Sequence, residues 1–377
     1  MNILCLDQFS ELGGAQRCLL ELLPAFANRG WSAHLAAPGE GELLLQAAAL
    51  HATTDRIPCG PYSSGRKSLA DMSRFAWEAP RLAREIRTLV RRYDADLIYV
   101  NGPRLLPSVA LAARHGPAVL FHSHSLLDGY ARRLAGRSLS MARAALVASC
   151  RFVALPLLPY CGDRGMRVVY NGVRQMAPAS RARTALDPEA EFRIGVIGRI
   201  SPEKGQADFL RAARILHHDF PHCRFLIYGA PLFSDPAAMR YRAELEALAE
   251  GLPVEFAGWQ ENVDGVLATL DLLVVPSAPV DATPRVILEA FAAGVPVLAF
   301  ASGGIPEIVA HDVTGFLVEE RSPHALASAI QGLLGEPRRM REIAERALAK
   351  TRGEFSLERY REQMLQAIEA EWRCART

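Results

Sequence analysis

The sequence contains very little lysine. Of its 43 basic residues, Lys67, Lys204 and Lys350 are the only lysines, and the other 40 are arginines. Long hydrophobic runs are also missing, because the most apolar stretch, residues 144–160, is interrupted by Arg151 and two prolines and is too short to span a bilayer. No basic segment precedes the first apolar residues, so we expect no signal peptide. These absences predict a cytoplasmic protein.

The cysteines show no metal-binding or disulfide pattern. There are seven of them, an odd number, and no two stand at the Cys-x-x-Cys spacing of zinc knuckles and redox pairs. Scattered thiols in a chain of 377 residues fit a reducing compartment. The first apolar run is not followed by Gly-x-Gly-x-x-Gly, which disfavours a nicotinamide-dependent oxidoreductase.

The charge is divided unevenly along the chain. The formal net charge is only +2, but residues 1–180 carry 21 Lys and Arg against 13 Asp and Glu, and residues 181–377 carry 22 against 28. The first half therefore has a charge of +8 and the second half of −6. Half of the residues are hydrophobic and 22% are charged, which excludes a disordered or fibrous chain. The length predicts two to three domains, and the charges suggest that they have different tasks.

Short apolar runs alternate with helical patterns throughout the chain. In the first half the runs lie at residues 2–6, 31–37, 97–100, 119–122, 145–148 and 167–170, and a second set begins at Phe192. This alternation is typical of βαβ units and parallel sheets. We therefore predict an α/β protein of two doubly wound, Rossmann-like domains facing a central cleft, residues 1–172 and 173–357. Ligands of such folds bind beyond the carboxyl ends of the strands.

The strongest motif lies in residues 274–309. Asp281 is expected in a loop, and Glu289, eight residues later, in a helix whose first turn suits Pro284. The N-terminus of that helix favours an anion such as a phosphate. Because the neighbours of Glu289 are apolar, its carboxylate needs a partner, and a vicinal diol can donate hydrogen bonds to it.

Two cations and a glycine pair add to this pattern. Arg199 ends the first strand of the second half, and Lys204 follows it by five residues, at the start of the next helix. Converging cations suit a diphosphate leaving group, because they neutralise its developing charge. Gly303 and Gly304 follow a later strand and let main-chain N–H groups approach a ligand closely.

Together these segments resemble the retaining glycosyltransferases of family 4, which have the GT-B fold. The resemblance is carried by Asp281 and Glu289, by the segment from Gly198 to Gly205, by Asn171-Gly172-Val173 and by Gly13-Gly14. It implies a donor-binding second domain, an acceptor-binding first domain, and a C-terminal helix, about residues 358–377, that crosses back to the first domain. It also implies retention of anomeric configuration with neither a cofactor nor a metal.

The resemblance assigns a role to each residue of the motifs. Arg199 and Lys204 are expected to bind the donor diphosphate, Glu289 the nucleotide ribose, and Asp281, one methylene shorter than the usual Glu, the transferred sugar. The main-chain amides of Gly303, Gly304 and Ile305 are expected to meet phosphate and sugar. Gly13 and Gly14 are expected to lie against the donor phosphate in the closed state.

A histidine after the fourth or fifth strand of the first domain is expected to face the sugar. His122 and His124 both qualify, and we favour His124 slightly. The expected catalytic residues are therefore His124, Asp281, Arg199 and Lys204. Two alternatives stay open, a nucleotide-sugar epimerase of the same fold and a non-catalytic nucleotide-sugar-binding protein.

Two weaker patterns do not predict a metal site. Asp94 and Asp96 form an Asp-x-Asp pair, but the pair precedes its strand and so lies at the wrong edge of the sheet. His122 and His124 have no third ligand near them in the sequence.

Residues 66–92 form a basic amphipathic segment that Pro80 is expected to interrupt. Its cations are Arg66, Lys67, Arg74, Arg81, Arg84, Arg87, Arg91 and Arg92, interleaved with apolar residues. It is either a solvated outer helix or a surface for anionic lipid headgroups. No aromatic-basic RNA motif is present, so nucleic acid is not an expected partner. The basic half suggests a glycan or lipid-linked acceptor, with the protein at the inner face of the plasma membrane.

Overall fold

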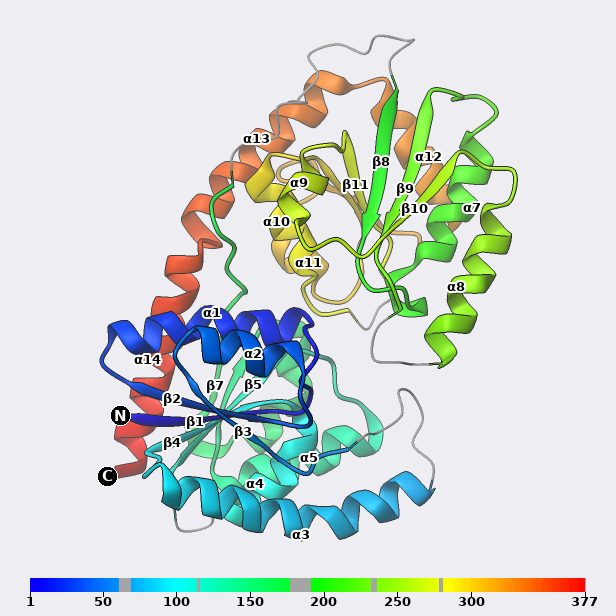
Figure 1. The fold of residues 1–377 in the computed structure, drawn as a ribbon. Coiled ribbons are helices and arrows are strands. Elements are labelled where there is room, and N and C mark those ends of the chain that lie inside the picture. The colour runs from blue at the N-terminus through cyan, green and yellow to red at the C-terminus, as the bar shows by residue number, and fades with distance from the viewer. Residues whose placement is uncertain (61–68, 114–115, 177–190, 232–235, 278–280, 377) are drawn as a thin grey trace. The chain divides into compact units, whose positions relative to one another are not determined.

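The computed structural model describes residues 1–60, 69–113, 116–176, 191–231, 236–277 and 281–376 (Figure 1). The chain divides into two compact units. Unit 1 contains Met1–Asn171 and Glu358–Thr377, and unit 2 contains Gly172–Leu357. Each unit has one parallel sheet with helices on both faces, which confirms the predicted two-domain Rossmann-like α/β architecture.

The sheet of unit 1 has seven parallel strands in the order β3-β2-β1-β4-β5-β6-β7. The strands are β1 (Asn2–Asp7), β2 (Ser32–Ala37), β3 (Thr53–Arg56), β4 (Leu97–Asn101), β5 (Ala118–Ser123), β6 (Ala145–Ala148) and β7 (Met166–Val168). The order reverses between β1 and β4, where the carboxyl ends of parallel strands form a binding crevice. Strand β3 was not predicted from the sequence, because this short edge strand is polar.

Helices cover both faces of this sheet (Figure 1). On one face lie α1 (Gly14–Asn28) and α2 (Glu42–Ala49), and on the other lie α3 (Leu69–Arg92), α4 (Leu106–Ala112) and α5 (Gly129–Ala142), with the short α6 (Arg151–Ala154) nearby. Buried side chains of the strands, of α3 and of α4, among them Phe121, Ile86 and Val109, form the core. The helix α3 continues through Pro80, and the residues that follow it, among them Leu82 and Ile86, pack into this core. The expected interruption at Pro80 was therefore wrong.

The last helix, α14 (Leu357–Arg376), packs against the start of the chain. The hydroxyl of Tyr360 donates to the carbonyl of Cys18 at 3.3 Å, and Nε of Arg361 donates to the carbonyl of Glu21 at 2.8 Å. Tyr360 is fully buried. Residues 358–377 are therefore an integral part of unit 1.

The sheet of unit 2 has six parallel strands in the order β10-β9-β8-β11-β12-β13. They are β8 (Phe192–Ile197), β9 (Cys223–Tyr228), β10 (Val254–Gly258), β11 (Leu272–Val275), β12 (Val297–Phe300) and β13 (Phe316–Val318). The helices α7 (Gln206–Leu216), α8 (Pro236–Ala249) and α12 (Pro323–Leu334) pack together on one face. On the other face lie α9 (Val263–Leu267), α10 (Arg285–Ala293), α11 (Ile305–Ile308) and α13 (Pro337–Glu354) (Figure 1). Here the order reverses between β8 and β11.

Among the described parts of the chain, no helix combines the length and the apolar character needed to cross a membrane.

Candidate functional site

The acidic and basic residues that the motifs single out in unit 2 follow the carboxyl ends of its central strands. Arg199 and Lys204 follow β8, Asp281 follows β11, and Gly303 follows β12. Since β8 and β11 flank the point where the strand order reverses, these loops lie where doubly wound folds bind their ligands.

Asp281 joins three of these loops. Its Oδ2 lies 2.6 Å from Nζ of Lys204, and its main-chain carbonyl accepts a hydrogen bond from the N–H of Gly304 at 3.2 Å. The Lys204 and Asp281 side chains are 25% and 14% exposed. The structure thus brings Lys204, Asp281 and Gly304 together at this edge of the sheet.

Gly205 makes this approach possible. Its φ is +72°, and a Cβ on it would lie only 1.7 Å from the carbonyl oxygen of Pro276, beyond β11. Only glycine therefore allows the turn containing Lys204 to pack against the end of β11.

Arg199 has an acidic partner within the same segment after β8. Its guanidinium pairs with Glu203, four residues later. Its main-chain carbonyl accepts a hydrogen bond from Nε2 of Gln206 at 2.9 Å, which fixes the loop to the first turn of α7. Both of the predicted diphosphate-binding cations are thus in contact with carboxylates.

Glu289 lies in α10 and is 14% exposed, as the apolar neighbours suggested. One of its oxygens lies 3.7 Å from Nε of Arg285, one helical turn earlier and 13% exposed. Arg285 was not predicted from the sequence, although an i,i+4 pair on a helix is a recognisable signal. Arg285 supplies one partner for the half-buried carboxylate of Glu289, which was expected to bind a ribose.

Several buried polar atoms around these loops lack a hydrogen-bond partner among the described residues. They are Oγ of Ser201, Oε1 of Gln206, Oγ of Ser277 and Oγ1 of Thr283. All four residues follow β8 or β11. A buried polar group without a partner costs about 1–3 kcal/mol, so such groups are normally satisfied by a ligand or by water. Their concentration here marks a polar, ligand-accepting region.

The amides after β12 are more occupied than the sequence analysis expected. The N–H of Gly304 donates to Asp281, and the N–H of Ile305 donates to the carbonyl of Ser302 at 3.1 Å. Gly303 adopts a φ of +56°. Hydroxyl Oγ of Ser302 donates to the carbonyl of Ser277 at 2.7 Å, so the loops after β11 and β12 are linked twice.

The remaining predicted residues lie in unit 1. Gly13 is the N-cap of α1, and Gly14 is its first residue. The N–H of Gly13 donates to Oε1 of Gln16 at 3.1 Å, and Nε2 of Gln16 donates to Oδ1 of Asp7 at 2.8 Å. These bonds hold the start of α1 beside the carboxyl end of β1.

The structure distinguishes the two candidate histidines. His122 lies within β5 and is 1% exposed, and its Nδ1 lies 2.5 Å from the hydroxyl of Tyr99. Burial lowers the pKa of His122 well below its usual value. His124 follows β5 and is half-buried, with Nε2 2.9 Å from Oδ1 of Asn101. The centroids of the two imidazole rings are 3.8 Å apart. Of the two histidines, only His124 is accessible.

Asp7 and Asn101 are two polar residues that were not predicted from the sequence. They end β1 and β4, are partners in the sheet register, and are both buried. Nδ2 of Asn101 lies 2.6 Å from Oδ2 of Asp7. Burial raises the pKa of Asp7 to about 6, although hydrogen bonds from Asn101, Phe9 and Gln16 act in the opposite direction. Their place at the ends of two adjacent strands was the available signal.

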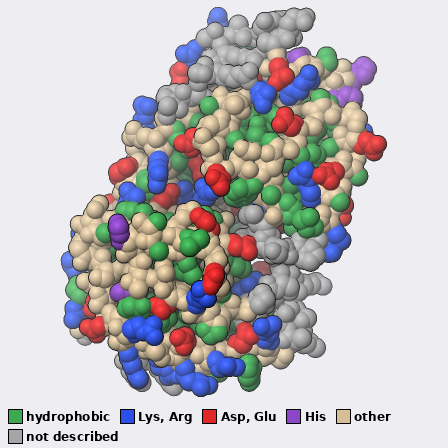
Figure 2. Space-filling model, viewed as in Figure 1, with side chains coloured by type: hydrophobic (Ala, Val, Ile, Leu, Met, Phe, Trp, Pro, Cys, Tyr) green, Lys and Arg blue, Asp and Glu red, His purple; other side chains and the backbone are tan. Residues whose placement is uncertain are grey.

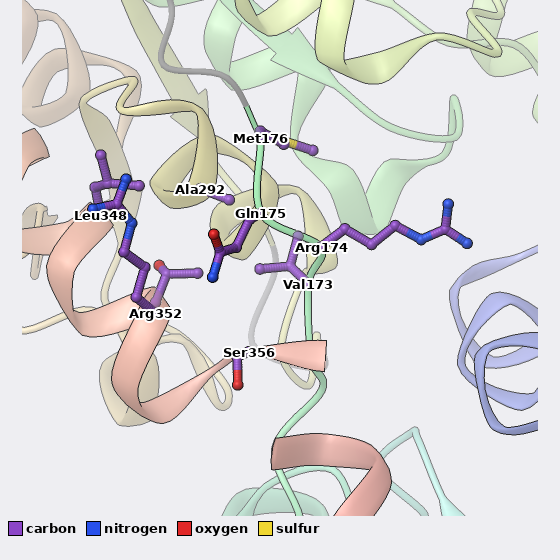
Figure 3. A pocket seen from close by; sticks show the side chains of 9 residues that line it. Val173, Arg174, Gln175, Met176, Ala292, Leu348, Arg352 and Ser356 are labelled. Carbon is purple, nitrogen blue, oxygen red and sulfur yellow. The ribbon is translucent and has the colours of Figure 1, made fainter. Parts of the chain in front are cut away.

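Unit 2 also has a small pocket apart from these loops. It is lined by Val173, Arg174, Gln175, Met176, Ala292, Leu348, Thr351, Arg352 and Ser356, none of them a predicted site residue. In Figure 3 the side chain of Arg174 extends away from the other labelled side chains. Within the described ranges, no group of three or more His, Cys, Asp and Glu residues is arranged to hold a metal ion.

Two family models match the chain. Residues 191–336 match the model described as glycosyl transferases group 1, and residues 12–175 match the model described as glycosyltransferase family 4. Together they cover most of both units.

The chain is also similar to parts of individual curated proteins. The D-inositol 3-phosphate glycosyltransferase of Segniliparus rotundus is 32% identical over 182 residues, 48% of this chain and 40% of that protein. The exopolysaccharide phosphotransferase SCO2592 of Streptomyces coelicolor is 27% identical over 273 residues, 70% of this chain and 27% of that protein. The chain thus spans well under half of the length of these curated relatives.

Solved structures match over nearly the whole chain. The Anabaena protein HepE, in complex with UDP and glucose, has a TM-score of 0.81 and 25% identity, with coverage of 98% of this chain and 99% of that one. Sucrose-phosphate synthase of Thermosynechococcus elongatus has a TM-score of 0.80 and 21% identity, with coverage of 99% and 100%. At 21% identity, the similarity to sucrose-phosphate synthase supports only the fold.

Proposed function

The chain belongs to the group 1 and family 4 glycosyltransferases of GT-B fold, and from this premise we propose that it transfers a sugar from a nucleotide-diphosphate sugar to a glycan or lipid-linked acceptor. In this proposal unit 2 binds the donor and unit 1 binds the acceptor. The two families matched, one in each unit, support this division. Because HepE was solved with UDP and glucose, UDP-glucose is the first donor to test.

One observation carries the proposal. Lys204 and Asp281 meet at the carboxyl ends of β8 and β11, among buried polar atoms that have no partner in the described structure. Charged and polar groups gathered in this way suit a ligand that carries both a diphosphate and hydroxyl groups. Arg199 lies on the same edge of the sheet.

In the proposed reaction the bond between the anomeric carbon and the diphosphate oxygen breaks, and its electron pair leaves with the diphosphate. The acceptor oxygen forms the new bond on the same face of the sugar, so the configuration is retained. The proton of the acceptor hydroxyl passes to the departing diphosphate. Arg199 and Lys204 neutralise the developing negative charge, the task that a metal performs in other transferases.

The proposal includes an anionic lipid surface as a partner of α3. Basic side chains gather along the lower edge of the molecule in Figure 2, over this helix. Trp77 is 65% exposed, and the guanidinium of Arg81 lies 4.6 Å from its ring centroid. A tryptophan between cations is suited to a membrane interface. Arg66 and Lys67 lie outside the described residues. The protein would then act at the cytoplasmic face of the plasma membrane.

The test is a donor screen by thermal shift, followed by mass spectrometry of the products. A donor that binds the native state raises the melting temperature by mass action. We expect Lys204→Ala to abolish most of the shift and the transfer, and Arg211→Ala, which alters an exposed arginine of α7, to change neither. Undiminished transfer by Lys204→Ala would overturn the role of Lys204. A new sugar epimer from the donor alone would overturn the transferase proposal, and so would donor binding without turnover on any acceptor.

A further inference from the structure

Three side chains of unit 1 form a hydrogen-bonded chain from the interior to the surface. Asp7 is fully buried at the end of β1, Asn101 is 3% exposed at the end of β4, and His124 is half-buried after β5. Nδ2 of Asn101 lies 2.6 Å from Oδ2 of Asp7, and Oδ1 of Asn101 lies 2.9 Å from Nε2 of His124. The chain therefore connects a carboxylate to the accessible histidine.

Main-chain groups around Asp7 fix which atoms donate and which accept in this hydrogen-bonded series. The N–H of Phe9 donates to Oδ1 of Asp7 at 2.9 Å, and a main-chain amide cannot reverse its role. Gln16 is fixed in the same way, because its Oε1 accepts from the N–H of Gly13 and its Nε2 must therefore face Asp7. Oδ1 of Asp7 is thus an acceptor twice, and Oδ2 is left to accept from Asn101.

The orientation of the Asn101 amide follows. The oxygen and nitrogen of an amide are exchangeable unless their neighbours decide between them. Here Nδ2 faces two acceptors, Oδ2 of Asp7 at 2.6 Å and the carbonyl of Ala15 at 3.2 Å, and both of its hydrogens are used. Oδ1 must then face His124, and a carbonyl oxygen can only accept.

We propose that Asp7, acting through Asn101, is a positioning residue that keeps the hydrogen of neutral His124 on Nε2 and holds its ring in one orientation. This inference rests on the proposed function and on the expectation, drawn from the family resemblance, that His124 faces the transferred sugar. Asp7 itself is too far inside to touch a ligand. Its effect is to present a single tautomer of His124 to the substrate, as partners behind a functional histidine commonly do.

The variant Asp7→Asn tests this directly, because it should reverse the chain. The new amide must keep its oxygen towards the N–H of Phe9 and so turn its NH₂ towards Asn101. Asn101 can accept from it only by offering Oδ1 inward and Nδ2 outward, which gives up the bond from Nδ2 to the carbonyl of Ala15. Nε2 of His124 then becomes an acceptor, and its hydrogen moves to Nδ1. The tautomer is read at pH 8 from the imidazole nitrogen signals of protein labelled with ¹⁵N-histidine. A His124→Gln variant assigns the signal of His124 among the ten histidines.

Tyr99→Phe is the matched control. It removes the hydroxyl that lies 2.5 Å from Nδ1 of His122, the neighbouring ring, and leaves Asp7 and Asn101 untouched. We expect it to change the signals of His122 and to leave the tautomer of His124 as it was.

The expected result is Nε2–H in the wild type and Nδ1–H in folded Asp7→Asn, with a fall in kcat of about 10- to 100-fold. The proposal is overturned if His124 of folded Asp7→Asn keeps its hydrogen on Nε2. If that variant does not fold, the wild-type spectrum alone still decides, because Nδ1–H on its His124 contradicts the proposal. Absence of transfer from every donor would refute the proposed function and leave the tautomer result valid, so the two failures are distinguishable.

Discussion

Lys204 and Asp281 stand 77 residues apart in the sequence and form an ion pair, with Nζ 2.6 Å from Oδ2. The cation expected to bind the diphosphate is thus already neutralised by the acid expected to contact the sugar. A donor diphosphate must take Lys204 from this carboxylate or share it. The pair therefore sets how strongly the site attracts an anion before the donor arrives.

Replacing Asp281 by Asn should separate binding from catalysis. Removal of the carboxylate leaves Lys204 available to an anion, so the affinity for a nucleoside diphosphate should rise about two- to fivefold, the range expected for a partly exposed pair. Transfer should fall, because the group assigned to the sugar is lost. Isothermal titration with UDP measures the first effect. Asp264→Asn, an exposed residue of α9, is the control, and weaker UDP binding by Asp281→Asn would contradict this account.

Asp7 should leave a signature in the pH dependence of stability. Its folded pKa is about 6, above its unfolded value near 4, so the folded state binds the proton more tightly. The stabilisation from this proton is present below about pH 4 and is lost as the pH rises to about 6, a change of about 3 kcal/mol. As the pH rises from about 4 to about 6, the free energy of unfolding of the wild type minus that of Asp7→Asn should therefore fall by this amount.

Urea unfolding of both proteins between pH 4 and pH 8 measures this difference. His122 acts in the opposite sense, because its pKa is lowered and acid destabilises the fold, but it is present in both proteins and cancels. A Trp259→Phe background leaves Trp31, Trp77 and Trp372, so that fluorescence follows unit 1 alone. A difference that does not change with pH would show that Asp7 titrates normally.

The sequence predicts the fold well because the alternation of apolar runs and helical patterns is a local signal. The identities of Arg199, Lys204 and Asp281 are also readable, since each follows an apolar run. Their contacts are not, because the pairing of Lys204 with Asp281 depends on β8 and β11 being neighbours in the sheet. The pairing of Asp7 with Asn101 likewise requires β1 to lie beside β4. Strand order is a property of the whole sheet, and single segments do not reveal it.

The basic face of α3 should bind anionic vesicles. Each cation near such a surface contributes about 1 kcal/mol, so replacing both Arg84 and Arg87, which are exposed, by Ala should weaken binding about 30-fold. Trp77→Ala should weaken it further, whereas Trp259→Ala, an exposed tryptophan of unit 2, should not. Sedimentation with vesicles of phosphatidylcholine, with and without phosphatidylglycerol, measures the binding. Equal binding to both vesicle types would contradict the proposed lipid surface. It would not affect the proposal that the protein transfers a sugar.

Glu371 anchors α14 within unit 1 through an ion pair that the interior encloses. It is 5% exposed, and its Oε2 lies 3.4 Å from Nη1 of Arg164, whose side chain is 13% exposed. Burial raises the pKa of Glu371 to about 7, and Arg164 and Arg143 oppose this shift. Arg164→Ala leaves an ionised carboxylate buried without this partner, so at pH 8 it should destabilise unit 1 by about 3 kcal/mol.

The stability that Arg164→Ala loses should become smaller as the pH falls from 8 to 6. Glu371 then takes up a proton in the folded state, and a neutral carboxyl no longer needs the guanidinium. Arg29→Ala is the matched control, because Arg29 also holds α14, through Glu362 and Glu369, but its side chain is 40% exposed. Its removal should cost less than about 1 kcal/mol. If the two variants lost the same stability at pH 8, or if the loss in Arg164→Ala did not depend on pH, the enclosed pair would contribute no more than a surface contact.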